Sequence, residues 1–145
     1  MFGKKGEISK PQSQITSLIS PGTEIDGHIS FKGGLRIDGH VTGNVTASGA
    51  NPSMLVLGEE GFIQGKICVS HAVINGTVLG PIQSHESLEL LALAKVTGSV
   101  YYKNIDIQLG ATINGMARHL DDVQPGNKVV TFKFSPESGE VNSPD

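Results

Sequence analysis

The chain has 145 residues, enough for one domain that closes a modest hydrophobic core without disulfide bonds. Its formal net charge of -3 lacks the basic excess of most nucleic-acid-binding domains, so no nucleic-acid partner is expected. Cys68 is the sole cysteine, which excludes an intramolecular disulfide. With no signal-peptide pattern, this predicts a cytoplasmic location. No apolar run approaches the roughly 18 to 20 residues that cross a bilayer, so any membrane contact should be peripheral.

Residues 1–20 are predicted to be a disordered N-terminal tail, because they are polar with only scattered apolar side chains. Met1, Phe2, Lys4 and Lys5 combine an aromatic ring with two cations. A ring in the lipid interface, beside lysines that face anionic headgroups, forms a weak anchor at about 1 kcal/mol per lysine. These four residues are therefore a candidate membrane-binding motif, and an ordinary disordered start is the alternative.

Residues 21–120 are predicted to form the folded domain, because one short pattern recurs through them. The pattern is apolar, any residue, Gly, any residue, apolar, from Ile25–Ile29 in the first copy to Ile113–Ala117 in the sixth. The steps between successive glycines are 16, 22, 15, 18 and 17 residues, which is 88 residues over five steps or about 17.6 on average. Such a repeat, built from strand formers and glycine turns, is typical of a β-solenoid. The six glycines are Gly27, Gly43, Gly65, Gly80, Gly98 and Gly115.

Strand geometry turns this period into a specific architecture. A coil of about 17 to 18 residues at about 3.3 Å each suits three short faces around a dry interior, and six coils stack at about 4.8 Å. The longest step should contain an outward loop at Ser48–Ser53. A second register supports the same period, because Val56, Val73, Leu90 and Ile107 are each 17 residues apart. Since alternate side chains of a strand point inward, the repeats should also stack Ile63, Ile67, Val78, Ile82, Val96 and Val100 in the core.

The two ends of such a solenoid carry unpaired backbone N–H and C=O groups, and most natural solenoids cover them with a capping element. Neither terminus here offers an amphipathic helix. We therefore expect end-to-end self-assembly, with an interface at Ile25, Ile29, Ile113 and Met116. Residues 121–145 are predicted to be a mostly disordered C-terminal tail, but Lys128–Phe134 alternates like a strand. Its folding back as a cap over the C-terminal end is the alternative.

Together these repeats resemble the bactofilins, a bacterial family of polymer-forming cytoskeletal proteins. The resemblance spans Ser17 to about Asp122 and rests on Ile25–Gly27, Leu35–Val45, Phe62–Ile67 and Lys95–Val100, in that order. It implies a right-handed parallel β-helix that assembles into filaments without nucleotide. It also implies a scaffold at the inner face of the cytoplasmic membrane that acts in cell shape or envelope organisation, with cell-wall-modifying or envelope proteins as partners. Family members often carry phenylalanine where this chain has Ile113.

No catalytic, cofactor-binding or metal-binding residues are expected, and we predict that the protein is not an enzyme. Gly65-Lys66 is followed by Ile67 and so lacks the hydroxyl residue of a phosphate-binding loop. His28 and His40 occupy the same place in two Ile-Asp-Gly-His repeats, which predicts two exposed turn positions. Cys68 is expected to be structural.

The alternative class is a left-handed hexapeptide-repeat enzyme, an acyltransferase or a carbonic-anhydrase-like trimer. Such enzymes need an apolar residue at every sixth position over many turns. The uneven steps between glycines argue against this class.

Overall fold

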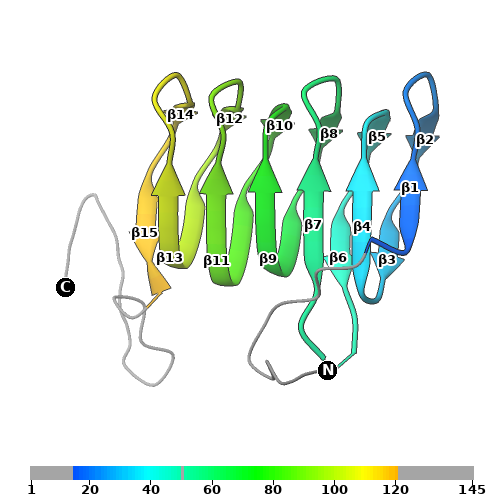
Figure 1. Cartoon of the computed structure of the whole chain (residues 1–145), viewed down its shortest axis with the longest axis horizontal. Helices are drawn as coiled ribbons and strands as arrows, with labels where there is room; N and C mark the ends of the chain where they lie inside the picture. The colour runs from blue at the N-terminus through cyan, green and yellow to red at the C-terminus, as the bar shows by residue number, and fades with distance from the viewer. Residues whose placement is uncertain (1–14, 50, 121–145) are drawn as a thin grey trace, which may run out of the picture.

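Short strands of Val, Ile and Leu, separated by glycine-containing turns, wind into six stacked coils (Figure 1). The computed structural model describes residues 15–49 and 51–120, and these residues contain no α-helix. The prediction of an all-β parallel helix is confirmed. The strands are β1 (Ser17–Ile19), β2 (Glu24–Asp26), β3 (Ile29–Phe31), β4 (Gly34–Ile37), β5 (His40–Thr42), β6 (Val45–Ala47), β7 (Met54–Leu57), β8 (Phe62–Gln64), β9 (Ile67–Ile74), β10 (Thr77–Leu79), β11 (Ile82–Leu90), β12 (Lys95–Thr97), β13 (Val100–Ile107), β14 (Thr112–Asn114) and β15 (Ala117–His119).

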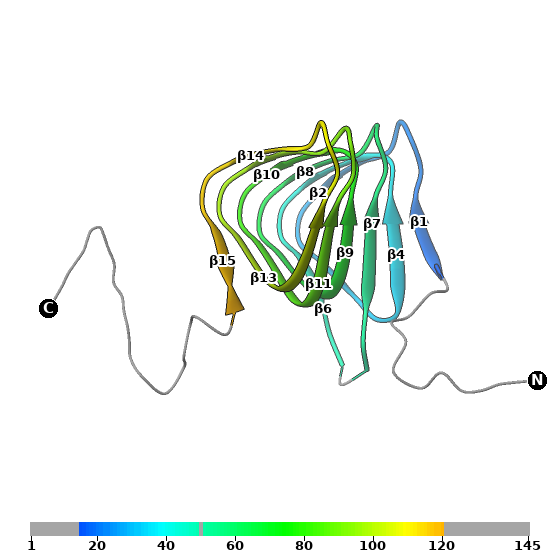
Figure 2. The same cartoon turned by 60° about the vertical axis from the view of Figure 1, so that its left-hand side comes forward.

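All strand pairs are parallel, and each strand pairs with its counterparts in the neighbouring coils (Figure 2). One sheet has six strands, one per coil, in the order β14-β12-β10-β8-β5-β2. The other sheet has nine strands and forms the rest of the wall. In its later coils the single strands β9, β11 and β13 run the length that two shorter strands share in the earlier coils.

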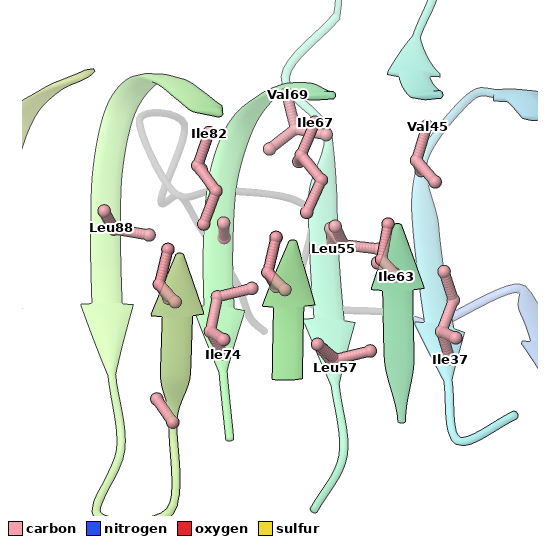
Figure 3. Close-up of a cluster of buried hydrophobic side chains, with 14 of the residues drawn as sticks. Ile37, Val45, Leu55, Leu57, Ile63, Ile67, Val69, Ile74, Ile82 and Leu88 are labelled. Atoms are coloured by element: carbon pink, nitrogen blue, oxygen red, sulfur yellow. The ribbon is translucent and has the colours of Figure 1, made fainter. Parts of the chain in front are cut away.

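Inward side chains stack on like side chains in columns. In the six-stranded sheet Val41, Ile63, Val78 and Val96 follow one another, each at most 2% exposed. In the nine-stranded sheet Val45, Ile67, Ile82 and Val100 do the same at 0% exposure. The predicted inward columns are confirmed, and Figure 3 shows Ile63, Ile67 and Ile82 among the side chains that fill the interior.

The six marker glycines lie in one column at the corner between the two sheets, where the backbone has positive φ. At Gly65, φ is +157°, and a Cβ atom would lie 2.1 Å from the carbonyl oxygen of Gly43 in the coil before. Backbone conformation and backbone packing therefore both require glycine there. This double requirement explains why glycine was the clearest marker in the sequence.

The opposite corner explains the unequal lengths of the coils. It is crossed either by two residues, as at Asn75-Gly76, or by four residues closed by an i to i+3 hydrogen bond, as at Gly58–Gly61 and Leu91–Ala94. The shortest step, of 15 residues, has the two-residue corner, and the 22-residue step combines a four-residue corner with the loop at 48–53. Extra residues in the turns and in the loop leave the strand register unchanged, whereas one extra residue lies within β11 and shifts it. The unequal coils also lack the strict six-residue period that the alternative enzyme class needs.

The four residues of the second register, Val56, Val73, Leu90 and Ile107, do not form one column. Val56 pairs with Val73, but Leu90 pairs with Ile74, and Val73 pairs with Glu89. The cause is a β-bulge in β11, where two residues, His85 and Glu86, lie opposite one residue of β9. One extra residue reverses which side chains face inward. Val73 therefore faces outward, whereas Leu90, 17 residues later, faces inward.

The position of β1 and the limits of the described residues both bear on the expected domain boundaries. β1 pairs with β4, so the first coil already includes residues 17–19 of the segment expected to be tail. Residues 1–14 and 121–145 lie outside the described part of the chain. In the loop at 48–53, Gly49, Asn51 and Pro52 are exposed, as expected for an outward loop, whereas Ser53 is buried.

Candidate functional site

At the two ends of the β-helix, the inward apolar side chains are no longer covered by a neighbouring described coil. Ile25 stacks on Val41 at the N-terminal end and Ile113 stacks on Val96 at the C-terminal end, and both are only partly buried. The interior members of the same column are fully buried. Ile29, over Val45, is likewise partly buried.

The remaining columns add end residues that were not among the four interface residues expected from the sequence. Ile19 begins one column in the first coil, and Ile107 ends the same column in the last coil at 49% exposure. Ile105 ends the neighbouring column and is partly buried. These strands carry no marker glycine. The alternation of Ile105 and Ile107 within a strand-like run was the available signal.

Exposed large apolar side chains also concentrate at the ends. Among the described residues, Ile15 and Leu18 belong to the start of the first coil, and Ile107, Leu109 and Met116 belong to the last coil. Leu109 is 98% exposed. Elsewhere in the described part of the chain, only Leu79 and Leu93 expose comparable side chains. Apolar surface that water covers at both ends can be buried by contact with another molecule.

Of the four interface residues expected from the sequence, three lie in the inward columns and one does not. Met116 directly follows Gly115, in the corner position that Asn44 and Lys66 occupy in earlier coils, and it is 57% exposed. Met116 therefore lies on the rim of the C-terminal end, beside the column that contains Ala117.

Backbone hydrogen bonds connect each coil to the next and stop at the end coils. The amide of Ile29 donates to the carbonyl of Asn44 at 2.8 Å, and the equivalent bond recurs through the stack up to Val100 and Met116. In the last coil the corresponding amide belongs to Ala117, and no later coil lies beyond it among the described residues. An open sheet edge of this kind pairs readily with another strand.

The two histidines expected at equivalent positions are both exposed but are not equivalent. His28 follows the corner glycine Gly27, and its Nδ1 atom accepts a hydrogen bond from the amide of Asn44 at 2.9 Å. His40 lies in β5, with its ring 5.4 Å from the ring of Phe62. The identical tetrapeptides cross different corners of the coil. The expected exposure is confirmed for both histidines, but the expected turn position was wrong for His40, which lies in a strand.

The polar side chains on the outer wall around the bulge form pairs. The Sγ atom of Cys68 lies 3.4 Å from Nε2 of His85, and Nδ1 of His71 lies 2.7 Å from Oγ of Ser87. Desolvation lowers the pKa of His71, and the charge of Glu86 partly opposes this shift. Within residues 15–49 and 51–120, no three His, Cys, Asp or Glu side chains are grouped as metal ligands would be. The candidate membrane-binding residues Met1, Phe2, Lys4 and Lys5 lie outside the described residues.

The described residues define a β-solenoid protein, a parallel β-helix whose apolar columns are partly exposed at both ends. A family model described as "Bactofilin: Polymer-forming cytoskeletal" matches residues 17–118. The chain therefore belongs to the bactofilin family. It is 27% identical over 120 residues to "Bactofilin BacP" of Myxococcus xanthus (strain DK1622), a match that covers 83% of this chain and 48% of that relative. The chain thus spans about half the length of that protein.

No solved structure gave a significant match. Within the described residues, no helix has the length and apolar character to cross a membrane.

Proposed function

We propose that this chain is a cytoskeletal scaffold that assembles into filaments, without nucleotide, through the two ends of its β-helix. The observation that carries the proposal is the loss of cover along the inward columns, which are buried in the middle coils and partly exposed at Ile25, Ile29 and Ile113. A second subunit on either end would cover these side chains and pair the open strand edges. Membership of a polymer-forming cytoskeletal family supports the same function.

The first test is to add charge at the ends. Purified wild-type protein should form filaments in negative-stain electron microscopy, with or without nucleotide. Ile113→Lys or Ile25→Lys should yield small soluble species, because a buried, unpaired ammonium in the contact is costly. The matched control is Thr97→Lys, an outward, exposed position one coil from Ile113, which should still polymerise. A wild type that stays monomeric over a wide range of concentration and salt would show the proposal to be wrong.

We also propose that the protein lies peripherally at the inner face of the cytoplasmic membrane and helps to organise cell shape or the envelope. One tail with Phe2, Lys4 and Lys5 would bind anionic lipid weakly, but a filament presents many tails, and avidity strengthens the attachment. Deleting residues 1–8 should abolish co-sedimentation with anionic liposomes while filaments still form. Neutral liposomes are the control. Unchanged sedimentation of the deleted protein would remove the anchor from the proposal.

Scaffolding also implies that the protein is not an enzyme. This is supported by the structural character of the family. A defined trimer that binds zinc or acyl-CoA in solution would instead favour the hexapeptide-repeat class.

A further inference from the structure

The C-terminal end of the β-helix is only partly covered by β15, the last strand among the described residues. β15 pairs with Val100–Tyr102, the first part of β13. The second part, Asn104–Ile107, pairs with β11 on one edge and with no described strand on the other. The carbonyl of Leu90 accepts from the amide of Gln108, so the equivalent carbonyl of Ile107 faces the open edge.

The sequence directly after the described residues does not suit a direct continuation along this edge. Extending the pairing of Tyr102 with His119 would place Asp122 over Ile105 and Gln124 over Ile107. A carboxylate and an amide would then lie in the apolar column, and burial of a carboxylate without a partner is unfavourable. Direct continuation along the edge with the two isoleucines is therefore unfavourable.

The segment Lys128–Phe134 has the pattern that this edge requires. Its apolar residues alternate, so Phe132 can lie over Ile105 and Phe134 over Ile107. In that register Lys133 lies opposite Asp106. An antiparallel pairing exchanges the two phenylalanines and keeps Lys133 at the same place.

The outer wall at this point also favours a cation. Asp106 is the register partner of Glu89 in β11, so two carboxylates are adjacent on the same face. Neither forms an ion pair with another described residue. Like charges in neighbouring strands are destabilising, and a lysine opposite Asp106 would relieve the repulsion.

The connection is long enough for this contact. Eight residue steps separate Leu120, the last described residue, from Lys128, and an extended chain of that length spans about 27 Å. Four residues of strand, such as Asn104–Ile107, span only about 13 Å. The segment can therefore reach either end of the edge, and its attachment to the same chain gives it a high effective concentration.

We propose that Lys128–Phe134 adds as a strand to the open edge of β13 at Asn104–Ile107 and competes there with a second subunit. The inference rests on the proposed assembly through the ends and adds its regulation. The segment lowers the readiness of the C-terminal end to bind another copy, and assembly requires its displacement.

The test compares two full-length double variants. Phe132→Glu with Phe134→Glu removes the side chains that would face the core, and Val129→Glu with Thr131→Glu adds the same charge to the opposite face. The first pair should lower the protein concentration at which filaments pellet by about fivefold or more, as expected for a coupled equilibrium. The second pair should change it much less. An equal effect of both pairs would overturn the proposal.

Hydrogen exchange separates this proposal from the assembly it rests on. In dilute, unassembled protein the amides of Ile105 and Ile107 should be protected, and Phe132→Glu with Phe134→Glu should remove that protection. Lys133→Glu should weaken it, and adding Asp106→Lys should restore it. Protection that survives the phenylalanine substitutions, or that appears only as protein concentration rises, would overturn the proposal and indicate a second copy as the occupant. Because hydrogen exchange is measured on unassembled protein, it tests the strand addition even if no variant polymerises.

Discussion

Gly65 and Gly27 occupy the same corner of different coils, yet their surroundings differ. Both have positive φ, at +157° and +149°. A Cβ atom at Gly65 would lie 2.1 Å from a backbone oxygen, whereas one at Gly27 would meet nothing within 4 Å, because no described coil precedes it. Comparing substitutions at Gly65 and Gly27 therefore separates the energetic effect of an unusual backbone conformation from that of backbone crowding.

We predict that Gly27→Ala lowers the free energy of unfolding by about 1 to 3 kcal/mol, the usual effect of a strained backbone conformation. Gly65→Ala should lower it by clearly more, because neighbouring coils must also separate. Urea unfolding in the assembly-deficient Ile113→Lys background measures both. Equal losses would mean that crowding between coils adds nothing.

His71 gives the outer wall a predictable response to pH. Its pKa is lowered from the ordinary value of 6.5 by burial, so the unfolded chain binds a proton more readily than the folded one. The stability that neutral His71 contributes is therefore complete above about pH 6.5 and is lost as the pH falls through the lower, folded pKa. Glu86 opposes this loss, since its charge favours the protonated ring.

We predict that the stability difference between wild type and His71→Asn shrinks on going from pH 7.5 to 5.0. Urea unfolding at both values measures it, and the other histidines cancel in the comparison because both proteins contain them. A difference that stays constant or grows on acidification would contradict the assignment.

At the scale of elements, Ser84 holds the bulge in β11. Its side chain is fully buried, and Oγ lies within hydrogen-bonding distance of the carbonyl oxygens of Ser70 and Ser87. At the bulge, the regular hydrogen bonding between strands is interrupted close to these carbonyls. The hydroxyl of Ser84 supplies a hydrogen bond in its place.

We predict that Ser84→Ala lowers the free energy of unfolding by about 1 to 3 kcal/mol, as expected for buried polar groups left unsatisfied. The control is Ser30→Ala, at an exposed position in β3. A change at Ser84 no larger than the control would show that the bulge does not depend on this hydroxyl. Thermal or urea unfolding decides between them.

The two corners of the coil and the bulge in β11 show which elements could be predicted from the sequence and which could not. The column of corner glycines was found because geometry allows no other residue there without strain, so the pattern survives every change of coil length. The opposite corner accepts Gly76, Ala94 or Ala111, and thus leaves no single residue to count. The bulge is encoded by two polar residues, His85 and Glu86, that look like any surface pair.

At the scale of the whole molecule, the sequence predicted that the ends of the β-helix are open, but it identified only some of the residues that form them. Ile25 and Ile113 belong to copies of the counted pattern and were placed correctly in the terminal coils. Ile105 and Ile107 were not assigned to the interface, because their exposure depends on how far β15, the last described strand, extends along β13, and no local pattern states this. Met116 fits the pattern, but its place on the rim follows from the path of the corner.

The direction of the hydrogen bonds between coils has a mechanical consequence. They run along the axis of the rod, so a pull along that axis stretches them, while the winding chain covalently links every coil within a subunit. A junction between two subunits has no such covalent link. Filaments built in this way should rupture under tension at the junctions and release intact subunits that can be used again.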